Sequence, residues 1–252
     1  MKRFLFSAAV LCATLGFTSC DPDKGKITDD FTINATVANG SDANQVDEVR
    51  AMSYIYGEDI PVDYDNDGEI DWYENGEGED IIIATAPFTN GGFKMTLPKT
   101  IDERLLSSMS DVPPGITVSN QNLKAASIEE FVAFKNDLRV GEFWCVGFGF
   151  QGEVESRLNY TFADRDCKIS GSSTETYWEY TYIDNYDIDL KKGWNIIYMT
   201  QIEEDNTYTF NLTTQKPSFN YVWYFEDGYY GDYDKPQKNA KKTPKKVFKF
   251  LK

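Results

Sequence analysis

The residues whose types and spacing most clearly indicate chemistry lie at 63–74, which read DYDNDGEIDWYE. This segment fits the calcium-loop pattern D-x-D-x-D-G-x5-E at every constrained position. Calcium binds six to eight hard oxygens, and a tight loop directs its first, third and fifth side chains inward, while a glycine at the sixth position allows the sharp turn. The predicted metal ligands are Asp63, Asp65, Asp67, the carbonyl of Glu69, Asp71 and Glu74.

The surroundings of this loop bear on its role. Residues 51–93 contain no Lys or Arg, so the carboxylates repel one another unless a cation neutralises them. The flanking segments YIYGEDIPV and NGEGEDIII indicate strands or turns, not the two helices of a calcium sensor. We therefore expect a structural Ca²⁺ site in a β connection, with a solvated acidic turn as the alternative.

The first 19 residues are typical of a secretion signal. Lys2 and Arg3 precede an apolar run, and the sequence FTSC places Cys20 where a small-residue cleavage site is expected. A cysteine at this point resembles the lipobox of bacterial lipoproteins, which implies lipidation of Cys20 and attachment to a membrane. The alternative is ordinary cleavage that leaves Cys20 as a free thiol.

Outside the signal and Cys20, the cysteines are Cys145 and Cys167, both in apolar, strand-like text. An exported protein meets oxidising conditions, which permit a disulfide between them. Cysteine also packs well as a small hydrophobic residue. A disulfide and two buried free thiols therefore both remain open.

Alternation of apolar and polar residues predicts an all-β fold. Many short strands separated by turn signals are typical of β-sandwiches. TNGG near residue 90 predicts a hairpin, and a second hairpin is favoured about Asn136 and Asp137. We expect two sandwich-like modules, residues 31–118 with the calcium loop and residues 119–252 with a basic tail, after a signal (1–19) and a lipidated linker (20–30). One larger sandwich is the alternative.

One short helix is expected near residues 100–110. Thr100 can cap it, and Glu103 completes a capping box. The double proline in DVPPGI then ends it.

Several phrases together resemble a known group of proteins. The lipoprotein start, IIIATAPFTNGGFKMTLP, YTFADRDCKISG and DLKKGWNIIY look like the exported lipoproteins of unknown function of gut Bacteroidetes. This resemblance implies transthyretin- or immunoglobulin-like β modules on the outer membrane, periplasmic or surface-exposed. It assigns no catalytic residues.

An aromatic segment near the C-terminus is a second candidate site. In YVWYFEDGYYGDYDKP, residues 221–236, aromatic rings alternate with carboxylates, as in surfaces that stack on sugars. The candidate glycan platform consists of Trp223, Tyr229 and Tyr230. Core packing is the alternative, because every second residue of a strand faces inward.

Composition excludes several function classes. The chain has a formal charge of −16, which argues against nucleic-acid binding. It contains no histidine, which removes the usual catalytic dyads and triads. GFGFQG at 147–152 matches a dinucleotide motif but continues into strand text, so no nucleotide cofactor is expected.

The sequence thus predicts a non-catalytic binding or structural module, anchored to the envelope, stabilised by calcium and binding a glycan or another envelope protein. A glycan hydrolase using two carboxylates is one alternative. An adhesin or fimbria-like component that assembles by strand exchange is another.

Overall fold

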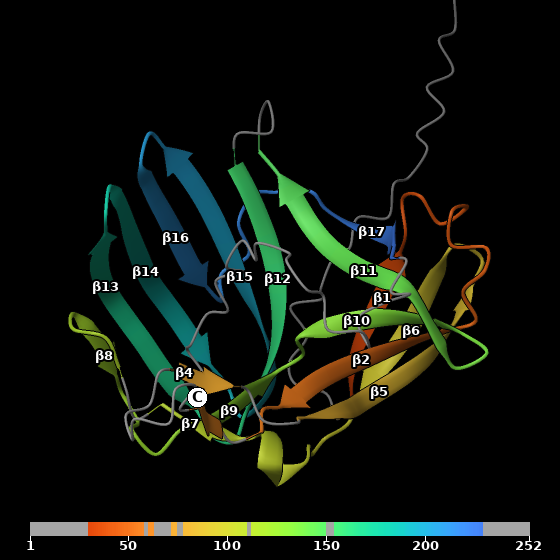
Figure 1. Ribbon diagram of the computed structural model, residues 1–252, viewed down its shortest axis with the longest axis horizontal. Helices are drawn as coiled ribbons and strands as arrows, with labels where there is room; N and C mark the ends of the chain where they lie inside the picture. The colour runs from red at the N-terminus through yellow and green to blue at the C-terminus, as the bar shows by residue number, and fades with distance from the viewer. Residues whose placement is uncertain are drawn as a thin grey trace, which may run out of the picture.

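The computed structural model describes residues 30–57, 60–62, 72–74, 78–109, 112–149 and 154–228, with only the backbone given for 60–62 and 72–74. Within these ranges the regular structure is β-strand apart from one 3₁₀ turn, so the all-β prediction is confirmed (Figure 1). No helix in this part of the chain has the length and apolar character to cross a membrane.

Seven of the described strands form a closed path, which we call the strand ring. Neighbours along it pair antiparallel in the order β1 (Phe31–Thr36), β6 (Gly92–Leu97), β5 (Glu79–Thr89), β2 (Glu48–Ile55), β10 (Glu130–Lys135), β11 (Leu138–Phe148) and β17 (Tyr221–Asp227). A parallel bridge between Val37, just after β1, and Trp223 in β17 closes the path. The Ala38 amide donates to the Trp223 carbonyl at 2.8 Å there.

Period-two alternation fills the strand ring with aromatic side chains. Trp223 lies at the centre, with ring centroids 5.2 Å from Phe93 and 5.1 Å from Phe131, both edge-to-face. Alternate residues of each strand point inward, as in Tyr221, Trp223 and Phe225 of β17. Burying each such ring contributes about 1.5–3 kcal/mol, and this packing is the main force that closes the ring.

The strand ring is part of a larger hydrogen-bonded sheet, and the other described strands of that sheet form what we call the outer sheet. Its order is β12 (Val154–Ala163), β15 (Gly193–Glu204), β16 (Thr207–Thr213), β14 (Tyr180–Leu190), β13 (Cys167–Tyr177) and β8 (Ile116–Val118). Two short strands, β9 (Lys124–Ser127) and β7 (Ser107–Ser108), extend from β12. The outer sheet joins the strand ring where Val146–Phe148 of β11 pair with β12.

One strand of the outer sheet departs from the antiparallel pattern. β16 lies between the consecutive strands β14 and β15, and it therefore runs parallel to β14. The turns β13–β14 and β15–β16 consequently emerge at the same end of the sheet, at the upper left of Figure 1.

The outer sheet contributes to two hydrophobic clusters. Tyr160, Phe162, Trp194 and Tyr198 of β12 and β15 join the core of the strand ring. On the opposite face, a smaller cluster lies toward β7, β8 and β9 and comprises Leu123, Ala125, Ala163, Cys167, Ile169, Tyr186, Ile188 and Leu190. The other end of this face, toward the two turns, belongs to neither cluster.

The predicted division near residue 118 does not separate two sheets. β2, from the first predicted module, pairs with β10, from the second. The larger core cluster likewise combines residues such as Met95 and Trp223 from both sides of that division. The described residues form two core clusters, but long-range strand pairing, not the division near residue 118, determines which residues belong to each.

The predicted helix near 100–110 is reduced to the 3₁₀ turn η1 (Glu103–Leu105). Asp102, not Thr100, caps it, and its carboxylate accepts from the Arg104 amide at 2.9 Å. The helix does not continue beyond this turn, because Ser107 and Ser108 form a strand that pairs with β9. Both predicted hairpin turns are confirmed, and their residues adopt positive φ: Asn90 and Gly91, Asn136 and Asp137.

Candidate functional site

The most exposed aromatic side chain among the described residues is at the turn between β13 and β14. Tyr177 pairs with Tyr180, so Trp178 and Glu179 form a two-residue hairpin turn. Trp178 is 99% exposed and has a φ of 58°. Two-residue hairpins normally place glycine or asparagine at positive φ, and a bulky residue there is strained. Trp178 therefore carries a conformational cost while burying almost no surface.

Four tyrosines surround this turn, and with it they form the surface that we call the aromatic tip: Tyr177, Trp178, Tyr180, Tyr182 and Tyr208. The registers place all four tyrosines on one face, because Tyr177 pairs with Tyr180 and Tyr182 pairs with Tyr208. Tyr182 and Tyr208 stack with centroids 5.4 Å apart and planes at 15°. The ring centroids of Tyr180 and Tyr208 lie 6.0 Å apart.

Carboxylates are interleaved with these rings. Glu175, by its charge and its hydrogen bond, raises the pKa of the Tyr177 phenol. Burial, followed by the charge and the hydrogen bond of Glu203, also raises the pKa of the Tyr208 phenol. The phenols therefore stay protonated at neutral pH and donate hydrogen bonds, while the carboxylates accept them. Aromatic rings with hydroxyl donors and carboxylate acceptors beside them are chemically suited to stacking on, and hydrogen bonding with, a hydroxyl-rich ligand.

The aromatic tip rests on the smaller core cluster through Tyr186 of β14. Tyr186 is 6% exposed, and burial, followed by the charges of Asp184 and Glu175, raises the pKa of its phenol far above the ordinary range. Phe210, also buried, pairs with Asp184 on the neighbouring strand. The exposed rings thus extend from a packed sheet, which limits the entropy lost when a ligand binds.

The predicted calcium loop lies largely outside the described residues. This holds for Asp63, Asp65, Asp67, Glu69 and Asp71, whereas Glu74 belongs to a strand whose backbone alone is described. β3 (Ile60–Val62) pairs antiparallel with β4 (Trp72–Glu74), so the loop joins the two strands of a hairpin. The predicted strand character of its flanks is confirmed, and calcium binding stays a prediction. No group of three or more potential ligands occurs among the described side chains.

The predicted glycan platform is wrong at Trp223. Its side chain is 1% exposed, because it points into the core of the strand ring, against Phe93 and Phe131. A ring enclosed in this way offers no face to a sugar. Tyr229 and Tyr230 lie outside the described residues.

Of the two interpretations for the cysteines, the structure supports two buried thiols that are not joined to each other. Cys145 is buried in the strand ring and Cys167 in the smaller cluster, so the disulfide is absent. The Cys167 thiol instead donates a hydrogen bond to the Asn120 carbonyl, with a sulfur–oxygen distance of 3.7 Å. Cys20 lies outside the described residues.

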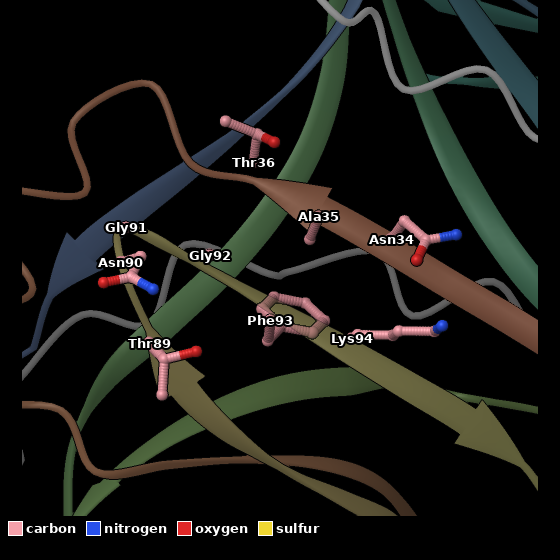
Figure 2. Close-up of a pocket in the computed structure, with 9 residues that line it drawn as sticks. All are labelled: Asn34, Ala35, Thr36, Thr89, Asn90, Gly91, Gly92, Phe93 and Lys94. Atoms are coloured by element: carbon pink, nitrogen blue, oxygen red, sulfur yellow. The ribbon is translucent and has the colours of Figure 1, made fainter.

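A shallow hollow of about 310 Å³ lies on the outer surface of the strand ring, between β1 and the β5–β6 turn. Figure 2 shows the residues that line it: Asn34, Ala35, Thr36, Thr89, Asn90, Gly91, Gly92, Phe93 and Lys94. A Cβ at Gly92 would lie 2.2 Å from the Ala35 carbonyl oxygen, so close backbone packing explains the glycine. The lining contains no carboxylate and cannot supply the acid pair of a glycosidase.

The dinucleotide-like motif at 147–152 has no helix in the described residues around it. β11 ends at Phe148 and the next described element, β12, is a strand. A Cβ at Gly147 would lie 2.7 Å from the Cβ of Phe219, which gives this glycine a packing role. The structural interpretation of the glycines is therefore favoured here.

Comparison with known proteins identifies no relative: no family model, curated protein or solved structure matches the chain. The aromatic tip is therefore a candidate site on the basis of its geometry alone. The sequence analysis did not identify Trp178 as a candidate. The usual turn signal is missing there, because TYWEYTY contains neither the glycine nor the asparagine that a two-residue hairpin turn favours.

Proposed function

We propose that the protein is an exported, envelope-anchored and calcium-stabilised module that binds a glycan, without catalysis, through the aromatic tip. The observation that carries this proposal is Trp178, which is almost wholly exposed at a strained φ. Strain at an exposed position persists when function selects the residue, since a stabler alternative is available to the chain. Exposed tyrosines and carboxylates beside it supply the remaining contacts.

Binding is tested with residues 21–252, the mature chain without the lipidated Cys20, by affinity electrophoresis through gels that contain a panel of neutral and acidic polysaccharides. Trp178→Ala should lose at least tenfold in retention on any polysaccharide that retards the parent protein. Phe148→Ala is the matched control, because Phe148 is also an exposed aromatic residue and lies away from the tip. Equal retention of Trp178→Ala and the parent, or no retardation by any polysaccharide, would sink the proposal.

Anchoring depends on Cys20, where lipidation attaches the mature protein to the outer membrane. Replacement of Cys20 by Ala should move the protein from the detergent phase to the aqueous phase in a detergent phase-separation assay. An unchanged distribution would count against lipidation. This test is independent of ligand binding.

Calcium stabilisation is proposed from the loop pattern and from the β3–β4 hairpin that the loop connects. Carboxylates held together without a cation repel one another, so excess chelator should lower the melting temperature, and Asp63→Ala should reproduce that change. Asp42→Ala, an acid in another loop, serves as control. A melt that is unaffected by chelator, together with no heat of calcium binding by calorimetry, excludes the metal site.

A second candidate function is assembly by strand addition, which one edge of β5 favours. β5 pairs with β2 along most of its length, but on its other edge only Phe88 and Thr89 pair with β6. No other described strand pairs with that edge between Glu79 and Pro87, and the nearby Ile82 is 48% exposed. A long apolar edge of this kind accepts an added strand.

Strand addition predicts concentration-dependent association of the mature chain, measured by light scattering after size-exclusion chromatography. Ile82→Lys should abolish it, because lysine on an edge strand opposes pairing. A monomer at every concentration argues against this second function and leaves the glycan proposal untouched.

A further inference from the structure

We propose that the aromatic tip selects uncharged glycans, and that Glu175 and Glu203 determine this selectivity by repelling anionic ones. The inference rests on the proposed glycan-binding function and specifies the class of ligand. It depends on the charges around the tip, the orientation of its rings and the positions of the nearest cations.

The strands that form the tip carry one sign of charge. Residues 172–187 and 199–213 contain no Lys or Arg. Their acidic residues are Glu175, Glu179, Asp184, Asp187, Glu203, Glu204 and Asp205. Single-sign charge on a surface attracts counter-ions and opposes ligands of the same sign. A polysaccharide rich in uronic acid or sulfate would meet this repulsion directly at the binding surface.

Three of these acids, Glu175, Asp184 and Glu203, lie on the same face as the rings, and two of them, Glu175 and Glu203, contact the rings of the tip. Glu175 pairs with Tyr182 across β13 and β14, and it accepts a hydrogen bond from Tyr177. Glu203 pairs with Tyr208 across β15 and β16, and it is the partner of that phenol. Each phenol holds its carboxylate at the edge of the stacking surface, where the remaining oxygen lone pairs accept from sugar hydroxyls.

Among the described strands beside the tip, β12 carries a cation on this face, Arg157, which is engaged elsewhere. Arg157 lies on β12, separated from β16 by β15. Its guanidinium forms an ion pair with Glu155 and lies 5.0 Å from the centroid of the Trp144 ring. It therefore does not offset the carboxylates at the tip.

The orientation of the rings opposes a cationic ligand as well. A cage for an ammonium group requires several ring faces directed at one point. Tyr182 and Tyr208 instead stack on each other at 15°, so that each covers a face of the other. Beside this pair, Trp178, Tyr177 and Tyr180 are 99%, 55% and 38% exposed, so that they can stack on an uncharged sugar chain.

The test uses two soluble polymers with the same backbone, hydroxyethyl cellulose and carboxymethyl cellulose, together with any further neutral polysaccharide of the panel and its carboxymethyl derivative. The measured quantity is the ratio of retention on the neutral polymer to retention on the anionic one. The parent protein should show a ratio well above one. The double variant Glu175→Gln with Glu203→Gln should lower the ratio about fivefold, as expected for two exposed charge interactions.

The matched control is Asp42→Asn with Glu226→Gln, which removes the same charge at exposed sites outside the tip and should leave the ratio close to that of the parent. Raising the salt concentration should also lower the parent ratio, because salt screens exposed charges. Thermal melts confirm that each variant is folded.

The outcomes separate this inference from the function on which it rests. Retention on anionic polymers that equals or exceeds retention on neutral ones, and that is lost in Trp178→Ala, overturns the selectivity and keeps glycan binding. An unchanged ratio in the Glu175 and Glu203 double variant overturns their role. No retention of the parent on any polymer overturns glycan binding itself, and the inference with it.

Discussion

Two aromatic segments of similar composition have opposite environments in this molecule. Residues 221–227 read YVWYFED and residues 176–182 read TYWEYTY, each with tryptophan in third place among tyrosines and acids. Trp223 is 1% exposed, whereas Trp178 is 99% exposed. Trp223 lies in a strand with neighbours on both edges, while Trp178 lies in the turn that ends a hairpin. Local composition therefore does not distinguish an enclosed tryptophan from an exposed one, whereas its position in the sheet or in a turn does.

The largest expected difference between the two segments is in folding stability. Trp223→Ala should lower the free energy of unfolding by about 3–5 kcal/mol, because it leaves a cavity among Phe93, Phe131 and Tyr221. Trp178→Ala should leave it within about 0.5 kcal/mol, as is usual for exposed positions. Chemical denaturation of both variants measures the difference. Similar losses in the two would mean that the tip is part of the structural core.

A smaller contrast concerns one tyrosine hydroxyl in each segment. The Tyr221 hydroxyl lies 2.8 Å from that of Ser156, which also accepts from Thr200 at 3.0 Å in a buried network. Tyr221→Phe should cost about 1 kcal/mol because a buried hydrogen bond is lost. Tyr180→Phe, at the tip, should leave denaturant stability unchanged. A neutral Tyr221→Phe would show that the network contributes nothing to stability.

Replacement of Trp178 by Asn should raise stability by about 0.5–1 kcal/mol. Asparagine tolerates positive φ, so the variant relieves strain in the turn. The same variant should lose glycan retention, because the stacking ring is removed. Denaturation midpoint and affinity electrophoresis on one preparation test both effects. A destabilised variant would indicate that Trp178 makes packing contacts that outweigh its strain.

The smallest effect at neutral pH is expected for Tyr186→Phe, and it should become visible only in alkali. Burial raises the pKa of Tyr186 in the folded state above its ordinary value of 10.0, and the carboxylates of Asp184 and Glu175 add to this. Its contribution to stability is therefore complete below pH 10, and it is lost as the pH rises from 10 through the folded-state pKa. Unfolding free energy measured from pH 8 to 11 should fall less steeply in Tyr186→Phe than in the parent. Parallel curves would contradict this.

Much of the local structure was predictable from the sequence. Period-two alternation predicts the strands, and residues that tolerate positive φ predict the hairpins at Asn90-Gly91 and Asn136-Asp137. The helix prediction failed because a capping box at 100–103 describes only the first turn, whereas Ser107 and Ser108 pair with β9 and so continue the chain as a strand. The parallel strand β16 had no local signal, since its place between β14 and β15 depends on pairing geometry.

The candidate site was predictable only in part. Aromatic rings interleaved with carboxylates predicted a glycan site, but the prediction was placed at the segment that contains Trp223, which is buried. The turn at Trp178 lacks the residues that normally mark a hairpin, so its exposure was not evident from pattern alone. The calcium pattern needs no tertiary information, because all its ligands lie within twelve consecutive residues.

The all-β class, the strands, two hairpin turns, the acidic charge and the calcium-loop pattern follow from the amino-acid sequence, because each depends on composition or on residues close together in the chain. Which tryptophan is enclosed and which is exposed depends on how the strands pair in three dimensions. The strand ring closes where Val37 meets Trp223, and next to it Asn39 bonds the backbone of Phe225, 186 residues away. Burial depends on such distant partners, so the same local pattern forms core in one place and an exposed aromatic surface in the other.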